Sequence, residues 1–259
     1  MSVQLSVEAI QSRLSSASIG HRILYLPSVS STMDVARREA EQGAPEGTVV
    51  VADEQTAGRG RFGRHWVSGS GQNLLFSVVL YPEQTALAGL NIIASVAALT
   101  AIQRTTALSP TLKWPNDILI AGKKMSGILI ETAVQDGGVR YAVLGFGINV
   151  NFDPSQTPEI AKSGTSLSKE LGKQVSREAL LEAILEELST LYERLKAWAT
   201  VRHRWEASLE TLGSHVRVQW GDQVEEGVAE AVDPDGNLLL RSSDGTVVTL
   251  SGGDVASQG

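Results

Sequence analysis

Apolar residues recur along the chain in two patterns, one typical of strands and one typical of helices. Short apolar runs predict strands at 21–26, 47–52, 74–80, 111–114, 118–120, 125–132 and 141–150. Longer runs, with apolar residues every three or four positions, predict helices at 7–14, 34–42, 87–102 and, as one helix or two, 177–209. The run at 87–102 is apolar on all sides, which indicates a helix buried in the core.

Tight turns join the strands between residues 111 and 150. Turn-forming residues stand at 115–117, 121–123 and 136–138. Short turns of this kind join antiparallel neighbours, whereas parallel neighbours need a long crossover. Residues 1–212 therefore predict an α+β domain with a mixed, mostly antiparallel sheet and helices packed on it.

The pattern changes after Gly213. Four short strands are expected at 216–218, 227–231, 238–241 and 247–250, with turns at 233–237 and 244–245. No run of helical spacing lies among them. Residues 213–259 therefore predict a second domain, a small β-barrel.

The chain has 259 residues, no cysteine and a formal net charge of -7. The negative charge argues against a general nucleic-acid-binding protein, which needs a basic face. Without cysteine the chain has no disulfides, thiolate nucleophiles or Cys-ligated metal centres, and the lack of disulfides fits a reducing cytoplasm. We expect no membrane span, and residues 1–14 lack the basic-then-apolar pattern of a signal peptide.

The segment from Gly58 to Trp66 concentrates positive charge in an otherwise acidic chain. Arg59, Arg61 and Arg64 alternate there with glycines, which let a backbone approach a ligand closely. Guanidinium groups offer planar forks of donors that suit phosphate and carboxylate. The segment therefore predicts a site for a compact anion. From the segment alone, a solvated Arg/Gly loop and an RNA-binding segment remain alternatives.

Three further segments combine turns, glycines and polar side chains. Lys113–Asp117 brings an ammonium, an amide and a carboxylate to a sharp turn, although turn geometry also favours Asn and Asp. Lys124 begins a strand in which Gly127 leaves room for a ligand beside the backbone, although adjacent lysines also occur at solvated turns. Gly145 and Gly147 lie within an apolar strand, where they indicate either close approach by a ligand or a β-bulge.

Other polar and aromatic residues have structural explanations as well as functional ones. Ser31 and Thr32 precede a predicted helix, where they suit an N-cap or a polar ligand. Trp66 suits stacking on a base, although a packed core is the more frequent place for tryptophan. The four histidines show no metal-ligand spacing, so we predict no permanent metal site.

Taken in order, five segments resemble the biotin protein ligases: Ser31–Thr32, Gln55–Trp66, Lys113–Asp117, Lys124–Glu131 and Gly145–Asn151. The Arg/Gly loop and the Lys-Trp-Pro-Asn-Asp turn are more specific together than either is alone. The resemblance implies a class II synthetase-like catalytic domain followed by an SH3-like barrel. It also implies a two-step reaction. Biotin and ATP, the latter bound with Mg²⁺, form biotinyl-5′-adenylate, and a carrier lysine then takes the biotinyl group.

The same resemblance implies roles for individual residues. Those implied to contact biotin are Ser31, Thr32, Gln55, Gly58, Arg59, Arg61, Lys124, Gly127, Leu129, Gly145 and Gly147. Those implied to contact ATP are Arg61, Arg64, Trp66, Asn116, Lys124 and Asn149. The implied catalytic residues are Arg61, Arg64, Lys124 and Asp117.

Two residues depart from the pattern of the family. Met33 stands where asparagine is frequent, so a polar contact or a cap is expected to be missing there. Phe146 stands where a smaller aliphatic is frequent, so the pocket for the biotin tail is expected to be reshaped. The stretch before His21 is too short for the helix-turn-helix domain of bifunctional members, so we expect no DNA binding.

The implied partner is a biotin carboxyl carrier domain of acetyl-CoA carboxylase or a related carboxylase. The ligase itself is expected to be a cytoplasmic monomer or homodimer. A lipoate–protein ligase and a non-catalytic biotin-binding regulator are the alternatives. The polar partners that a ureido ring needs favour biotin over lipoate, whose dithiolane needs an apolar slot.

Overall fold

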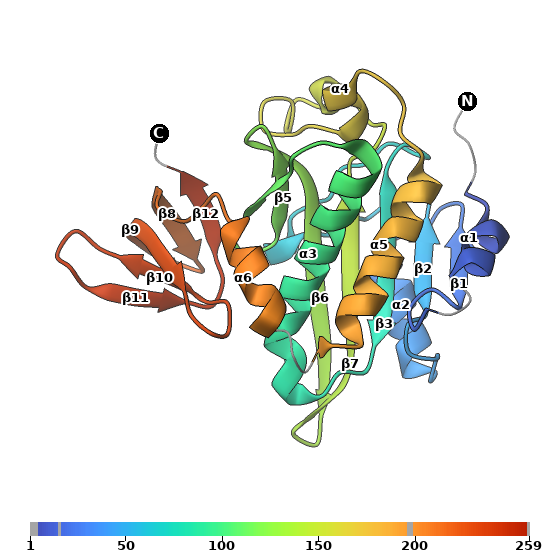
Figure 1. The fold of residues 1–259 in the computed structure, drawn as a ribbon, viewed down its shortest axis with the longest axis horizontal. Coiled ribbons are helices and arrows are strands. Elements are labelled where there is room, and N and C mark those ends of the chain that lie inside the picture. Colours follow the sequence, from blue (N-terminus) through green and yellow to red (C-terminus); the bar gives the residue numbers. More distant parts are fainter. Residues whose placement is uncertain (1–4, 15–16, 196–198, 258–259) are drawn as a thin grey trace.

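A seven-stranded sheet forms the centre of the larger part of the molecule (Figure 1), in a computed structural model that describes residues 5–14, 17–195 and 199–257. Its strand order is β1-β2-β3-β7-β6-β5-β4, and only β1 and β2 pair in parallel. The strands are β1 (Ile23–Leu26), β2 (Val49–Ala52), β3 (Leu74–Leu80), β4 (Thr111–Lys113), β5 (Asp117–Ile120), β6 (Lys123–Gln135) and β7 (Gly138–Ile148). The predicted mixed, mostly antiparallel sheet is confirmed.

Helices cover both faces of this sheet. The long helices α3 and α5 lie side by side across one face, and α2 packs on the other face against β2, β3 and β7. The helices are α1 (Val7–Arg13), α2 (Thr32–Glu41), α3 (Leu87–Thr106), α4 (Leu167–Leu171), α5 (Arg177–Tyr192) and α6 (Ala199–Ala207). The predicted helix at 177–209 is thus two helices, and residues 196–198 between them lie outside the described part of the chain.

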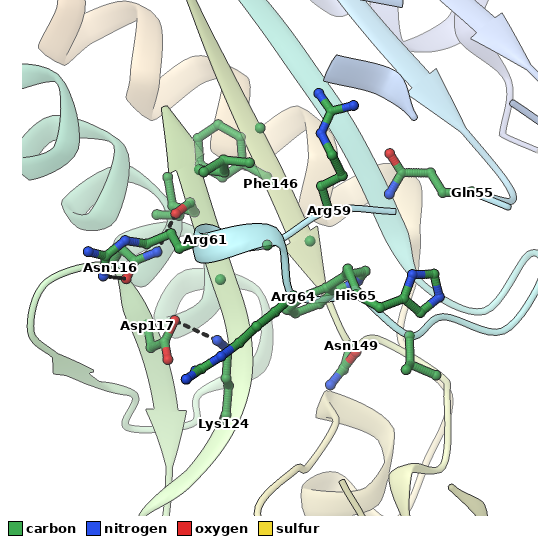
Figure 2. Close-up of a pocket in the computed structure, with 18 of the residues that line it drawn as sticks. Gln55, Arg59, Arg61, Arg64, His65, Asn116, Asp117, Lys124, Phe146 and Asn149 are labelled. Atoms are coloured by element: carbon green, nitrogen blue, oxygen red, sulfur yellow. Dashed lines mark hydrogen bonds and ion pairs between the residues drawn. The ribbon is translucent and has the colours of Figure 1, made fainter. Parts of the chain in front are cut away.

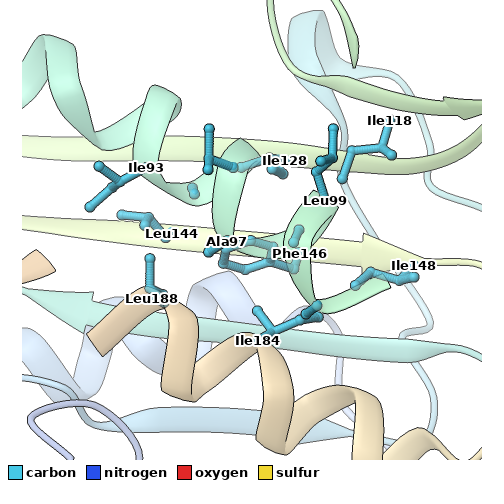
Figure 3. Close-up of a cluster of buried hydrophobic side chains, with 14 of the residues drawn as sticks. Ile93, Ala97, Leu99, Ile118, Ile128, Leu144, Phe146, Ile148, Ile184 and Leu188 are labelled. Carbon is cyan, nitrogen blue, oxygen red and sulfur yellow. The ribbon is translucent and has the colours of Figure 1, made fainter. Parts of the chain in front are cut away.

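Strand alternation divides the sheet residues between the two faces. Leu144, Phe146 and Ile148 of β7 enter the core beneath α3 and α5 (Figure 3), where Phe146 stacks on Phe76 with ring centroids 4.5 Å apart. Gly145 and Gly147, between them, face the side on which α2 lies. The side chain of Phe146 thus fills the core on the opposite face, although the residue also borders the cavity on the α2 face, so its effect on the biotin pocket stays a prediction.

Helix α3 combines the length and composition of a membrane span with a position in the core. Among the described residues, 84–106 is the one helical stretch long and apolar enough to cross a membrane. Of its most apolar window, 72% is buried inside the protein. The helix packs on the sheet and on α5, as expected for a core helix.

A β-bulge in β6 turns one side chain toward the α2 face. Along β5 the partners are Asp117 with Gly127 and Ile118 with Ser126, but Leu119 pairs with Lys124. Met125 is therefore the extra residue; it is fully buried in the core. The bulge shifts the alternation by one position, so Lys124 lies on the same face as Gly127.

A second, five-stranded antiparallel sheet follows, in the order β11-β10-β9-β8-β12. Its strands are β8 (His215–Trp220), β9 (Gln223–Val232), β10 (Leu238–Arg241), β11 (Val247–Leu250) and β12 (Asp254–Ser257). Trp114 joins it to the larger part, since its indole nitrogen donates to the carbonyl of Gly236 at 2.9 Å. The small sheet domain is confirmed, whereas its boundary near Leu212 stays a prediction.

Candidate active site

A cavity of about 200 Å³ opens on the α2 face of the large sheet, beside the loop between β2 and β3 (Figure 2). It brings together segments from β5, β6, β7, the start of α2, the Arg/Gly loop and β12. The predicted site residues that line it are Ser31, Thr32, Gln55, Arg59, Arg61, Arg64, Trp66, Asn116, Asp117, Lys124, Gly127, Leu129, Gly145, Gly147 and Asn149. Gly58 lies just behind the lining, against Gln55 and Trp66.

The floor of the cavity is apolar and is built on glycines. Trp66 lies directly over Gly147, where an added Cβ would stand 2.5 Å from ring atom Cε2. The same ring lies 3.2 Å from the Cβ position of Gly127. Met33 packs in the same way against Gly145. Since any larger side chain would displace these neighbours, the glycines are needed for close packing of the floor.

One end of the cavity is lined by polar side chains at the start of α2. Gln55 accepts two hydrogen bonds at its carbonyl oxygen, from the backbone nitrogen of Thr32 at 2.8 Å and from its hydroxyl at 3.0 Å. Ser31 occupies the N-cap position, but its side chain does not cap the helix. Its hydroxyl is buried and has no hydrogen-bond partner in the described structure. A buried hydroxyl without a partner is costly, so this group is available to a polar ligand.

Arg59 does not point toward the cationic end of the cavity. Its guanidinium donates to Asp34 at 2.7 Å and to Glu131 at 3.3 Å, and in Figure 2 it extends away from Lys124. These two carboxylates, led by the hydrogen bond to Asp34, raise the pKa of Arg59. Its side chain therefore links the loop to α2 and β6, and it is not a free cation for a ligand.

Arg61 is a half-buried cation with neutral partners. It donates to the amide oxygen of Asn116 at 3.2 Å and to the carbonyl of Gly253 at 3.3 Å. Among the described residues no carboxylate lies within ion-pair distance of it. Burial lowers its pKa, with the more distant charges of Asp254 and Asp117 acting in the opposite direction. Since buried charges are normally paired, this guanidinium is suited to an anionic ligand.

Lys124 and Asp117 form the other charged group of the cavity. The ammonium lies 2.7 Å from the carboxylate and 5.7 Å from the centre of the Trp66 ring. Figure 2 shows this pair beside Arg64, whose guanidinium forms an ion pair with Asp254 of the small sheet. The arrangement joins a cationic end to the apolar floor within one cavity.

Asn116 and Asn149 have structural partners that limit what they offer. The amide nitrogen of Asn116 donates to the carbonyl of Ile128, and that of Asn149 donates to the carbonyl of Thr165 at 3.0 Å. The amide oxygen of Asn149 is buried without a hydrogen-bond partner among the described residues. The indole nitrogen of Trp66 has none either. Both are therefore free to bond with a ligand.

Sequence reasoning missed several residues that border the cavity. They are Gly60, His65, Val67, Ile128, Ile160, Ser163, Gly164 and Asp254. Gly164 forms an isolated bridge with Lys124, which places an irregular segment after β7 at the mouth. Asp254 comes from the small sheet, and no local pattern marks it. His65 is adjacent to the predicted loop arginines and could have been included with them.

The cavity thus has a polar end, an apolar floor and a cationic end. Such a shape suits a ligand with a hydrogen-bonding head, an apolar chain and an anionic group. Among the described residues no cluster of three or more metal-ligating side chains occurs.

Two family models match the chain. One, described as the biotin/lipoate A/B protein ligase family, matches residues 25–149. The other, described as the biotin protein ligase C-terminal domain, matches residues 211–256. The bifunctional ligase/repressor BirA of Bacillus subtilis is 35% identical over 247 residues, covering 93% of this chain and 76% of the relative. The chain belongs to the biotin protein ligase family.

Other members of the biotin protein ligase family agree with this assignment. The biotin–[acetyl-CoA-carboxylase] ligase of Mycobacterium tuberculosis is 35% identical over 239 residues, covering 87% of this chain and 85% of that protein. The biotin protein ligase of Aquifex aeolicus, solved in complex with biotin and ATP, superposes with a TM-score of 0.78 at 28% identity. The match covers 92% of this chain and 98% of that one.

Proposed function

We propose that this protein is an ATP-dependent biotin–protein ligase. In the first step the carboxylate oxygen of biotin attacks the α-phosphorus of ATP, the bond to the β-phosphate oxygen breaks, and pyrophosphate leaves. In the second step the ε-amine of a carrier lysine attacks the acyl carbon, and AMP leaves. Neither step requires a nucleophile from the protein, in keeping with a chain that lacks cysteine.

The observation that carries the proposal is the combination of three surfaces in one cavity. The polar end suits a ureido ring, because Ser31 offers an unpaired buried hydroxyl beside Thr32 and Gln55. The glycine floor suits an aliphatic chain, with Gly127, Leu129, Gly145 and Gly147 beneath it. The cationic end suits the carboxylate and the phosphates. Biotin has these three parts in this order.

Arg61 and Lys124 supply the electrostatic part of the reaction in this proposal. The two reactants are both anions, so their approach is unfavourable unless positive groups offset the repulsion. Arg61 is half-buried, where a charge acts more strongly than in bulk water. Lys124 is held by Asp117, and Arg64 extends the positive region outward.

The nucleotide is proposed to lie at the cationic end, with its metal ion. Mg²⁺ usually binds through one or two carboxylates together with the phosphates of the substrate. Asp117, which lines the cavity, fits that mode, and the described residues form no independent metal site. Mg²⁺ is therefore proposed to enter the site bound to ATP. Trp66, Asn116 and Asn149 are the proposed contacts to the nucleoside.

The proposed acceptor is a lysine of a biotin carboxyl carrier domain. The Mycobacterium tuberculosis relative is named for acetyl-CoA carboxylase, so a carrier domain from such a carboxylase is the substrate to test. Asp117 lies beside Lys124 at the cavity and is the proposed partner for the incoming amine. We propose that the protein acts in the cytoplasm, whose reducing conditions suit a chain without disulfides.

The direct test is transfer of biotin to a purified carrier domain in the presence of ATP and Mg²⁺. We expect labelling of one carrier lysine, no labelling without ATP, and none on a carrier Lys→Ala variant. The same assay with lipoate tests the other acid in the family description. Transfer of lipoate alone would refute the biotin assignment, and ligand binding without pyrophosphate release would indicate a non-catalytic regulator.

Adjacent lysines provide a matched pair of variants for the same assay. Lys124 lies in the cavity and pairs with Asp117, whereas Lys123 is exposed at the start of the same strand. We expect Lys124→Ala to abolish most pyrophosphate release while Lys123→Ala retains it. Equal rates for the two variants would remove Lys124 from the mechanism.

A further inference from the structure

The Arg/Gly loop touches the small sheet at three points. Arg64 forms an ion pair with Asp254, and Arg61 donates to the carbonyl of Gly253 at 3.3 Å. Phe62, between the two arginines, packs edge-on against Trp220 with ring centroids 6.5 Å apart. The contacts all come from one region of the small sheet, the end of β8 and the start of β12. The loop is thus held against the second domain.

The conformation of Phe62 shows that these contacts impose a geometry on the loop. Its φ of 56° lies in the left-handed region, which a bulky side chain rarely adopts. Its side chain is 56% exposed, so burial does not account for that conformation. It lies between Trp220 and the guanidinium of Arg61, which stands 4.8 Å above its ring. Strained residues of this kind persist where surrounding contacts over-determine them.

The small sheet is shaped for this close approach. Trp220 lies directly against the backbone of Gly252, where an added Cβ would overlap its ring. The same added Cβ would lie 3.1 Å from Nη2 of Arg61. Only a residue without a side chain allows Trp220, Arg61 and this backbone to meet. The meeting brings Asp254, two residues further along, to the mouth of the cavity.

We propose that Asp254 is an internal anion that occupies Arg64 in the absence of nucleotide and is displaced by the triphosphate of ATP. The inference rests on the proposed function, since it assigns the cationic end of the cavity to ATP. A carboxylate and a phosphate oxygen make the same kind of charge-assisted hydrogen bond with a guanidinium. One therefore takes the place of the other, and Asp254 sets the apparent affinity for ATP.

The exposure of the pair is suited to exchange. Arg64 is 67% exposed and Asp254 is 32% exposed, so water and salt weaken their attraction. Such pairs contribute little net stability and separate readily. Removal of the charge of Asp254 leaves Arg64 without this competing partner, so ATP is expected to bind more tightly.

The test is the variant Asp254→Asn, which keeps the shape of the side chain and removes its charge. We expect the dissociation constant for ATP, measured by calorimetry on the biotin-free protein, to fall about two- to fivefold, as for loss of one partly exposed charge contact. The KM for ATP in biotin-dependent pyrophosphate release should fall by a similar factor. High salt should reduce the difference, since it screens exposed charges.

Glu226→Gln is the matched control. Glu226 lies in the same sheet, pairs with Arg217 at 3.5 Å across the surface, and does not line the cavity. Its variant changes the net charge by the same amount, so ATP affinity should stay as in the unmodified protein. A gain equal to that of Asp254→Asn would show a general charge effect and overturn the proposal.

A double variant tests whether the effect passes through Arg64. Adding Asp254→Asn to Arg64→Ala should leave ATP affinity nearly unchanged, because the pair is already broken. Weaker ATP binding by Asp254→Asn alone would show instead that the carboxylate supports the bound nucleotide, and the proposal would be wrong.

The proposed function can fail separately from this inference. If ATP binds but no biotin-dependent pyrophosphate is released, the function fails and the calorimetric comparison still decides the role of Asp254. If neither the unmodified protein nor the Asp254→Asn variant binds ATP, the inference fails as well.

Discussion

Replacing Gly147 by alanine tests whether the floor of the cavity positions the reacting groups. An added Cβ would stand 2.5 Å from Trp66 Cε2, whereas ordinary contacts begin near 3.4 Å, so the ring must move by about 0.9 Å (3.4 − 2.5). Its other near atoms, Cζ2 and Cδ2, are at 2.8 and 2.9 Å, so rotation within the ring plane does not remove the overlap. The whole indole therefore shifts away from the strand, into the space where a ligand is proposed to lie.

The expected cost falls mainly on activity. A displacement of about 1 Å in a reacting arrangement costs on the order of 100-fold in rate. We therefore expect kcat/KM for biotin in pyrophosphate release to fall on the order of 100-fold in Gly147→Ala. The free energy of unfolding should fall by about 1–3 kcal/mol, as for other overpacked sites, which leaves the protein folded.

Gly138→Ala is the control, in the same strand. Its added Cβ meets nothing closer than the carbonyl of Gln135 at 3.8 Å, so neither activity nor stability should change appreciably. The measurements are initial rates of biotin-dependent pyrophosphate release and urea unfolding of both variants. The expected loss of kcat/KM in Gly147→Ala is on the order of 100-fold. If its kcat/KM stayed within about threefold of that of Gly138→Ala, the proposed position of Trp66 would be refuted.

Three further predictions concern single groups. Arg61→Ala should lose pyrophosphate release by at least about 100-fold while its thermal midpoint is unchanged or higher, because a half-buried, partly desolvated cation without a carboxylate partner is removed. A large drop in the midpoint would show a structural role. Burial, together with the hydrogen bond to Asp53, raises the pKa of Tyr25 to about 12, so the folded protein favours the neutral phenol. The stability that this phenol contributes is complete below about pH 10 and is lost as the pH rises toward 12. Urea unfolding at about pH 9 and about pH 11 should therefore show a smaller loss in Tyr25→Phe than in the unmodified protein, and equal losses would contradict the assignment. Cleavage by trypsin within 58–71 should slow when biotin and ATP are added, because the loop arginines then contact the adenylate; unchanged cleavage would argue against closure of the loop.

Local patterns predicted most of the elements. The apolar runs at β3, β10 and β11 were predicted to the residue, because strong local patterns bounded by turns mark their ends. Helix α4 was missed because five residues give no helical period; its ends are marked only by the N-cap of Ser166 and by Gly172. Strand β12 was missed because Asp254–Ser257 has no alternation, and its pairing with β8 is long-range.

Within the site, residue identity was predictable from the sequence but side-chain direction was not. The loop arginines look equivalent in the sequence, yet Arg59 pairs with Asp34 and Glu131, whereas Arg61 is half-buried and donates to Asn116. These partners lie far away along the chain, so spacing within the loop carries no information about them. Lys124 faces the cavity because of the bulge at Met125, which depends on pairing with β5. Asp254 is separated from Arg64 by 190 positions.

The alternation of β7 has a consequence for changing what the enzyme accepts. Positions 145 and 147 face the cavity, whereas 144, 146 and 148 belong to the core beneath α3 and α5. A library of substitutions confined to the odd positions of this strand and of β6 after its bulge would sample new acids while leaving the packing of α3 and α5 intact. Trimming Met33, which packs against Gly145 within the smaller core cluster under α2, would then make room for biotin analogues with a modified tail.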